Sequence, residues 1–448
     1  MVRQNHFMYF IAALVSLGGI LYGYDIGVIS GALLFIKQTI PMSDSQVGLI
    51  VGAVLAGGLI GTLIAGPMGD NYGRRPLIMI ACIVFMLGII FVMLAHSFLI
   101  IFLARLLLGV GVGVIAVAVP LYVAEIVPSE NRGKYMTMFQ LLLTFGIVLA
   151  YVTDLLFTSS GNWRGMFAIV LMPASVLFAG MIFLPETPRW LIANNYLDKA
   201  TQVLNRIRTS PDIVQEEILE IKRGLQETHG TWKELFSRAF WLPTMIAIAI
   251  AIFNQLTGIN SFLQYAPLIL KNAGMGSDTV AMLGSAGIGI INFCSTIISI
   301  ALIDTLGRRP LLLTGVTGVM LSECYLGCVQ LLDVTPFTTG ILSLIGLFSF
   351  IVFFAIGPGV VVWLAISESF PTRLRGKGMS LCLFFNSLAS TLLAIFFLPM
   401  SAAIGMAQTY WLFALFTLGY FLVVFLMLPE TKTKSLEEIQ LQFQARDH

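Results

Sequence analysis

The chain has 448 residues, of which 58% are hydrophobic and only 11% are charged, and its formal net charge is +2. Soluble globular proteins carry about 25% charged residues. The composition therefore excludes a soluble globular protein and indicates one that is embedded in a lipid bilayer.

Twelve apolar runs of about 20 residues follow one another along the chain, and each is long enough to cross a hydrocarbon core about 30 Å thick. They begin near residues 7, 46, 77, 98, 136, 164, 240, 279, 310, 338, 377 and 408. The first run lacks the short apolar core and the cleavage site of a secretory signal. The sequence therefore predicts an all-α integral membrane protein with twelve transmembrane helices.

Lysine and arginine are distributed unevenly between the two sides of this topology. If the N-terminus is cytoplasmic, Lys37, Arg164 and Lys271 fall outside and Arg105 lies within a span, which leaves 21 of the 25 Lys and Arg residues on the cytoplasmic side. Positive charge concentrates in cytoplasmic loops. We therefore expect a multi-pass membrane protein with both termini in the cytoplasm.

Three short segments recur in the same order in the two halves of the chain. The repeats pair residues 69–77 (GDNYGRRPL) with 303–311 (IDTLGRRPL), 124–134 (AEIVPSENRGK) with 367–377 (SESFPTRLRGK), and 184–190 (LPETPRW) with 428–434 (LPETKTK). Parallel repeats of six helices form two bundles with the substrate path between them. We expect an N-terminal bundle at residues 1–190, a cytoplasmic linker with short helices at 191–238, a C-terminal bundle at 239–430 and a cytoplasmic tail at 431–448.

Eight motifs together resemble those of the major facilitator superfamily, and specifically of its sugar porter family, across essentially the whole chain. They are YGYDIGVISG in helix 1, GDNYGRRP after helix 2, RLLLGVGVG in helix 4, Glu-x-x-Pro followed by Arg-Gly after helices 4 and 10, PETPRW after helix 6, QLTGIN in helix 7, GPGVVVW in helix 10 and PETKTKSLEEI in the tail. The resemblance implies the major facilitator fold, sugar transport by alternating access and a location in the bacterial inner membrane.

Charged residues recur at the predicted inner ends of the helices in both halves. They are Asp70, Arg74, Arg75, Glu125, Arg132, Asp304, Arg308, Arg309, Glu368 and Arg375. Alternating signs at neighbouring helix ends favour a cytoplasmic gate, in which ion pairs latch the two halves when the cavity faces outward. The alternative is ordinary loop charge that follows the positive-inside rule, but topology does not require the acidic residue of the repeated Glu-x-x-Pro.

Carboxamides within the spans are candidate sugar ligands, because a sugar offers hydroxyls for hydrogen bonds and C–H faces for aromatic rings. The candidates are Gln140, Asn254, Gln255, Asn260, Asn292 and Asn386, with Trp363, Tyr22 and Tyr265 as aromatic faces. The alternative for each amide is a bond that only joins two helices, worth about 0.6 kcal/mol. The resemblance favours binding for Gln140, Gln255, Asn260, Asn292 and Trp363, which fall where sugar porters place sugar-contacting residues.

Several residues depart from the family pattern. The departures are Asn254 for a Gln, Gln264 for the first of two adjacent tyrosines, Ser387 for a Trp, and Val360 and Val362 for prolines. They predict a roomier or more polar pocket than that of well-known glucose and xylose carriers. In helix 7, Gly258 and Pro267 predict local unwinding near the binding face.

Ionisable side chains inside a span cost about 2.5–3.5 kcal/mol on insertion scales and usually face a partner or a water-filled path. Helix rise places Asp25 and Arg105 at similar depths in the outer half of the bilayer, which predicts a pair. Protonation of Asp25 would release Arg105, an arrangement that resembles proton-coupled sugar porters. The alternative is a permanent ion pair. For Glu323 in helix 9 we expect a protonated side chain bonded to a neighbour rather than a role in proton transport.

These features predict proton-coupled import of a hexose or a pentose across the cytoplasmic membrane. The alternatives are a facilitative sugar or polyol uniporter, a proton-driven drug antiporter and a sugar sensor; Asp25, the amides of QLTGIN and the short tail after Pro429, respectively, argue against them. No nucleophile with a base and no metal cluster indicates an enzyme, and the five cysteines fall within predicted spans. We expect a monomer in the bilayer that binds a sugar and a proton, without cofactor, metal or nucleic acid.

Overall fold

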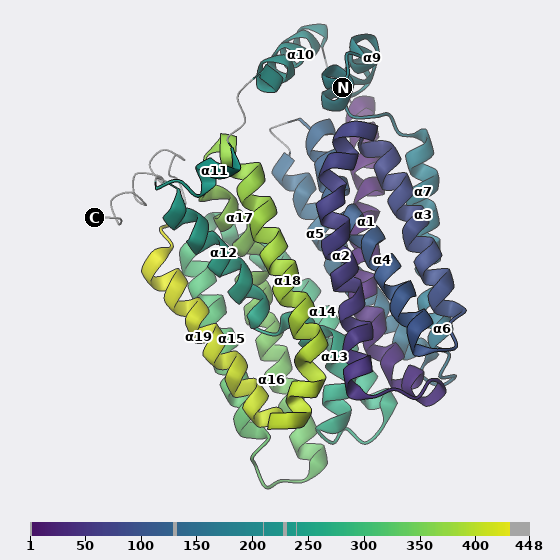
Figure 1. Ribbon diagram of the computed structural model, residues 1–448, viewed down its shortest axis with the longest axis vertical. Helices are drawn as coiled ribbons and strands as arrows, with labels where there is room; N and C mark the ends of the chain where they lie inside the picture. The colour runs from purple at the N-terminus through teal and green to yellow at the C-terminus, as the bar shows by residue number, and fades with distance from the viewer. Residues whose placement is uncertain (1, 129–131, 209, 227–230, 239, 431–448) are drawn as a thin grey trace. The chain divides into compact units, whose positions relative to one another are not determined.

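A computed structural model of the protein describes residues 2–128, 132–208, 210–226, 231–238 and 240–430, and the regular structure in these ranges is helical (Figure 1). In chain order the helices are α1 (Val2–Thr39), α2 (Asp44–Tyr72), α3 (Arg74–Met93), α4 (Phe98–Ile126), α5 (Arg132–Phe157), α6 (Trp163–Ala168), α7 (Leu171–Phe183), α8 (Pro188–Ala193), α9 (Leu197–Ile207), α10 (Pro211–Gln226), α11 (Trp232–Leu235), α12 (Trp241–Leu256), α13 (Ile259–Asn272), α14 (Asp278–Leu306), α15 (Arg308–Val329), α16 (Pro336–Ile356), α17 (Pro358–Glu368), α18 (Thr372–Ile404) and α19 (Met406–Met427).

Among these residues, 12 stretches of helix are long and apolar enough to cross a membrane. Three of them consist of two consecutive helices each, namely α6 with α7, α12 with α13, and α16 with α17. The others are single helices. The predicted all-α fold with twelve transmembrane helices is confirmed, and each span begins within a few residues of its predicted start.

In two of these three spans, a glycine or a proline causes the break between the two consecutive helices. Gly258 lies between α12 and α13 with φ 80°, in the left-handed region that favours glycine. Pro358 begins α17 directly after Gly357, because proline lacks the N–H that would continue α16. The predicted unwinding of helix 7 is therefore confirmed at Gly258. It is wrong at Pro267, which lies inside α13, since transmembrane helices tolerate the single backbone hydrogen bond that a proline removes.

Four short helices, α8 to α11, lie between the sixth and the seventh spans. Helix α9 buries Ala200, Val203, Leu204 and Ile207. Residues spaced by three, four and seven positions share one face of a helix. The polar side chains of α9 therefore lie on the opposite face of the helix.

Contacts within the chain divide it into two compact units. Unit 1 comprises Met1–Asp25, Ala56–Ile147 and Phe167–Thr228, and unit 2 comprises Ile26–Leu55, Val148–Met166 and His229–His448. In unit 1, α3 packs against α4 and α7; in unit 2, α15 packs against α16 and α19. Helices α1, α2, α5 and α6 each have residues in both units, so that unit 2 includes residues from the first half of the chain.

Candidate functional site

A buried ion pair joins α1 and α4 inside unit 1. Nη1 of Arg105 donates a hydrogen bond to Oδ1 of Asp25 at 2.7 Å, and the two side chains are 0% and 2% exposed, respectively. The guanidinium carbon of Arg105 also lies 5.8 Å from the centre of the Phe167 ring. Removal of either partner from such a buried ion pair would leave the other charge buried without compensation, which strongly destabilises a protein. The structure thus brings together the two residues predicted to couple proton binding, and their coupling role stays a prediction.

Two predicted sugar-contacting residues also belong to unit 1. Tyr22 precedes Asp25 by about one turn of α1, Gln140 lies in α5, and both side chains are half-buried. The two helices cross closely because Gly23 has no side chain: a Cβ at this position would overlap the carbonyl oxygen of Leu143 in α5. The close crossing fixes the stretch of α1 that carries both Tyr22 and Asp25.

Four polar side chains of α12, α13 and α18 form a connected cluster in unit 2. Nε2 of Gln255 donates to Oδ1 of Asn386 at 3.2 Å. Nδ2 of Asn260 donates to Oε1 of Gln255 at 2.9 Å and to Oγ of Ser390 at 2.7 Å. Gln255 and Asn260 are only half-buried, and a carboxamide both donates and accepts. The amide cluster, defined by these four residues, can therefore exchange its internal bonds for bonds to hydroxyl groups.

Two other predicted sugar contacts of unit 2 hold helices together in this structure. Asn254 is 3% exposed, and its Nδ2 donates to the carbonyl oxygen of Pro358 at 3.1 Å, where α17 begins. Tyr265 is fully buried, and its hydroxyl donates to the carbonyl oxygen of Ala394 at 2.9 Å. These contacts match the alternative stated for the amides, a bond between helices. The sugar contacts proposed for these two residues stay predictions.

The last two candidates of unit 2 lie in α14 and α17. Asn292 of α14 is 7% exposed, and its backbone carbonyl accepts a hydrogen bond from the hydroxyl of Thr296 at 2.8 Å. Trp363 of α17 is half-buried. Their roles also stay predictions.

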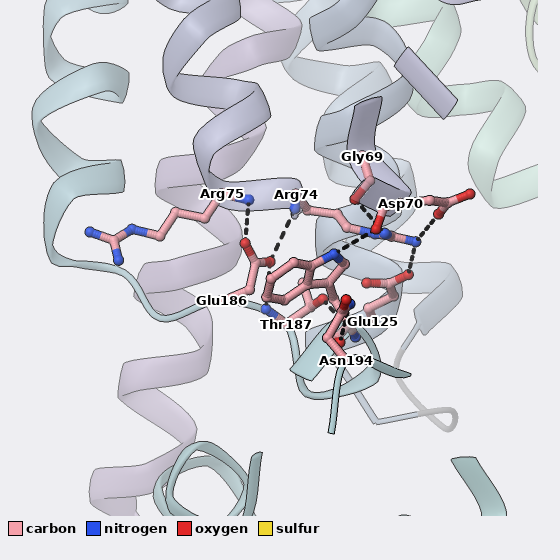
Figure 2. A network of polar contacts seen from close by, with 9 residues as sticks. Gly69, Asp70, Arg74, Arg75, Glu125, Glu186, Thr187 and Asn194 are labelled. Carbon is pink, nitrogen blue, oxygen red and sulfur yellow. Dashed lines mark hydrogen bonds and ion pairs between the residues drawn. The ribbon is translucent and has the colours of Figure 1, made fainter. Parts of the chain in front are cut away.

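Figure 2 shows a polar network in unit 1, where α2 meets α3. Nη2 of Arg74 forms ion pairs with Asp70 and with Glu125, each at 3.1 Å. The two carboxylate oxygens of Glu186 accept the backbone N–H groups of Arg74 and Arg75, each at 3.1 Å. Because the first N–H groups of a helix have no partner within the helix, this carboxylate caps α3.

The same arrangement recurs in unit 2, where α14 meets α15. Nη2 of Arg308 lies 3.3 Å from Oε1 of Glu368. The carboxylate oxygens of Glu430 accept the backbone N–H groups of Arg308 and Arg309 at 3.1 and 2.9 Å. The bonds around Arg74 therefore lie within unit 1, and the corresponding bonds around Arg308 lie within unit 2. The predicted latch between the two halves stays a prediction.

The other predicted gate residues have separate settings. The guanidinium groups of Arg75 and Arg309 donate to backbone carbonyls of α7 and α19. Arg375 lies in the first turn of α18. The side chains of Arg132 and Asp304 lie outside the described residues, as does the tail predicted at 431–448.

Glu186 lies outside the membrane-spanning helices and is partly buried. Burial raises the pKa of this carboxyl, while the N–H groups of Thr187, Arg75 and Arg74 and the positive charge of Arg74 act in the opposite direction. The residue before Arg74 is Gly73, with φ 98°, and a Cβ there would overlap the Glu186 carboxylate. The glycine thus makes room for the cap and supplies the left-handed backbone that starts α3.

We expect Glu186→Gln and Glu430→Gln each to lower the melting temperature of the purified protein. An amide has one acceptor oxygen instead of two, so one of the two capped N–H groups loses its partner, at a cost of about 1–3 kcal/mol. Thermal unfolding in detergent measures the effect. The matched control is Glu220→Gln on α10, whose side chain is exposed. Equal melting temperatures for all four proteins would show that the caps are not needed.

Asp154 was missed in the sequence interpretation, although it is a buried carboxyl within a span. Its Oδ2 accepts the backbone N–H of Gly31 at 3.1 Å, so the side chain joins α5 to α1 within unit 2. One turn earlier in α5, the hydroxyl of Tyr151 donates to the carbonyl oxygen of Leu263 in α13 at 2.6 Å. The rule that identified Asp25, an ionisable residue in an apolar run, would also have found Asp154.

Glu323 is fully buried in α15, on which α19 packs. Neither oxygen of its carboxyl has a hydrogen-bond partner in the part of the chain that the structure describes. The protonated side chain bonded to a neighbour therefore stays a prediction for Glu323. Among the described residues, no group of three or more His, Cys, Asp or Glu side chains could hold a metal ion.

Comparison with known proteins identifies the family. The model of the family described as "Sugar (and other) transporter" matches residues 11–443. The chain belongs to the sugar porter family. This sugar porter is 35% identical over 455 residues to the glucose transporter GlcP of Staphylococcus epidermidis, with 99% of each chain covered. It is 33% identical over 440 residues to the galactose-proton symporter of Escherichia coli K12, with coverage of 98% of this chain and 95% of that protein.

A solved structure supports the same assignment. The sugar porter matches the inward open conformation of the xylose transporter XylE from E. coli with a TM-score of 0.85 and 26% sequence identity, over 97% of this chain and 99% of that one. The major facilitator fold is therefore confirmed. As a member of this family the chain is a multi-pass membrane transporter of bacterial type, rather than an enzyme.

Proposed function

We propose that the protein imports a monosaccharide, a hexose or a pentose, together with protons across the bacterial inner membrane. The single observation that supports proton coupling is the ion pair between Asp25 and Arg105. Its two atoms lie 2.7 Å apart, and both side chains are almost completely buried. A relative that shares this family, the E. coli protein, is named a galactose-proton symporter. We place both termini in the cytoplasm, because that orientation satisfies the positive-inside rule.

The sugar binds to the amide cluster of unit 2, with Gln140 and Trp363 as further contacts. Gln255 and Asn260 bond to each other and to α18, so a sugar hydroxyl can replace those bonds without leaving a buried polar group unsatisfied. The break at Gly258 separates the helix of Gln255 from that of Asn260. Movement at this break can adjust the cluster around the sugar.

The proton binds to Asp25. Protonation neutralises the carboxylate and removes its attraction to Arg105, while the Phe167 ring still lies beside the guanidinium. Helices α1 and α4 then gain freedom to move, and release of the proton restores the pair. At the cytoplasmic ends, the networks around Arg74 and Arg308 act as the gate, with residues 1–190 and 239–430 as the two bundles and 191–238 as the linker. The transporter works as a monomer.

Uptake of a panel of labelled hexoses, pentoses and polyols, with and without a proton uncoupler, tests this function. We expect one or a few monosaccharides to accumulate inside cells above the external concentration, and the uncoupler to reduce the internal level to the external one. Uptake that the uncoupler leaves unchanged would indicate a uniporter. A panel without any transported sugar would contradict the substrate class.

Within the same assay, Asn260→Ala tests the amide cluster. The substitution removes the donor to both Gln255 and Ser390, and we expect the half-saturating sugar concentration to rise about tenfold, the effect of one or two lost hydrogen bonds. Asn205→Ala, at an exposed position of α9, is the matched control. An unchanged half-saturating concentration in the Asn260 variant would place the sugar elsewhere.

A further inference from the structure

A cavity of about 440 Å³ lies in unit 1 beside the network of Figure 2. Its wall is built by the turn between α2 and α3, the loop that carries Glu186, and helices α8 and α9. Tyr122 anchors this loop, because its hydroxyl donates to the carbonyl oxygen of Pro185 at 2.6 Å. The transport function proposed above makes no use of this cavity.

Cationic side chains dominate the charge of this cavity. Lys199 and Arg206 stand two turns apart on the polar face of α9, together with Gln202. Among the described residues, neither cation has a carboxylate within ion-pair distance. Arg75 adds a third positive charge to the wall, whereas Glu186 supplies the one carboxylate, whose oxygens already accept N–H groups. The cavity therefore attracts an anion.

Aromatic rings form the rest of the wall. The rings of Trp190 and Tyr196 stack with centroids 6.1 Å apart and an interplanar angle of 22°. Nε1 of Trp190 donates to the backbone carbonyl oxygen of Asp70 at 2.9 Å, which fixes the indole against the end of α2. Nζ of Lys199 lies 5.0 Å from the centre of the Tyr196 ring. A ligand bound to the two cations of α9 would thus meet a fixed aromatic face with its organic part.

We propose that this cavity binds an organic phosphate. The phosphate lies between Lys199 and Arg206, whose donors suit phosphate oxygens, and the organic part packs on Trp190 and Tyr196. Binding connects α8 and α9 to the turn between α2 and α3. It thereby stabilises the Glu186 carboxylate in its position as the cap of α3. The phosphate has two sources, a soluble phosphate ester or the headgroup of an anionic phospholipid.

Binding to the purified full-length protein tests the proposal for the soluble source. The probe is glucose 6-phosphate, followed by calorimetry and by thermal unfolding, with glucose and inorganic phosphate as reference ligands. We expect glucose 6-phosphate to bind and to raise the melting temperature. The double variant Lys199→Ala/Arg206→Ala should bind at least about tenfold more weakly, since each charge-assisted hydrogen bond is strong.

The lipid source is tested with the same proteins in nanodiscs of phosphatidylcholine alone or with added phosphatidylglycerol. If the ligand is a lipid, phosphatidylglycerol should raise the melting temperature of the wild type and not that of the double variant. The matched control in both arms is Lys222→Ala/Arg223→Ala, which removes two exposed cations from α10 and should respond as the wild type does. Equal responses of the two double variants, or no response to either probe, would overturn the proposal.

Discussion

Asp25→Asn should abolish accumulation of sugar against a gradient while downhill exchange of sugar across the membrane continues. The substituted amide has nearly the shape of the carboxyl and can still accept a hydrogen bond from Arg105, but it cannot bind and release a proton. Without this step, the sugar can only equilibrate. Uptake of the transported sugar into energised cells, and exchange in proteoliposomes without a proton gradient, measure the two activities.

Asp44→Asn is the matched control for this variant. Asp44 pairs with Lys37 at 2.9 Å, but the two side chains are 54% and 35% exposed, and exposed pairs contribute little. We expect the control to accumulate sugar as the wild type does. Undiminished proton-driven accumulation in the Asp25 variant would remove Asp25 from the coupling mechanism. Loss of both activities, together with a lowered melting temperature, would assign the pair to stability alone.

Gly23→Ala should prevent formation of a stable transporter. A Cβ at Gly23 would overlap the backbone carbonyl oxygen of Leu143, and rotation of a side chain cannot relieve a clash with backbone. Helices α1 and α5 would have to separate, at a cost of about 3 kcal/mol or more. Size-exclusion chromatography should show little folded protein, and what remains should melt at least about 5 °C lower.

The control for this prediction is Gly66→Ala in α2, where a Cβ would meet no atom within 4 Å. We expect that variant to fold as the wild type does or to be slightly more stable, because alanine favours helix over glycine by about 1 kcal/mol. Wild-type yield and melting temperature for Gly23→Ala would mean that α1 and α5 do not cross as closely as described.

The twelve spans could be predicted from the sequence because the thickness of the bilayer sets the length of an apolar helix. The meeting of Asp25 and Arg105 was predictable for a related reason. The constant rise of a helix converts residue number into depth, and a buried charge requires a partner at the same depth. The unwinding at Gly258 followed from the conformational freedom of glycine.

Other features depend on contacts that no local pattern encodes. Glu186 caps α3 from 112 residues away, and the sequence indicated only that its motif is repeated. Likewise, Ser390 completes the amide cluster but resembles any other serine in an apolar helix. Tyr265 was chosen as an aromatic face, yet its hydroxyl bonds to α18. Side-chain direction decides between these roles, and it follows from packing rather than from spacing along the chain.

Sugar-driven proton entry tests the central claim most directly. The purified protein is placed in liposomes that contain a pH-sensitive dye, with the membrane potential clamped, and the transported sugar is then added outside. The proposed symport carries protons inward with the sugar, so we predict that the interior becomes acidic when sugar is added. Sugar entry without any change in internal pH would contradict the account.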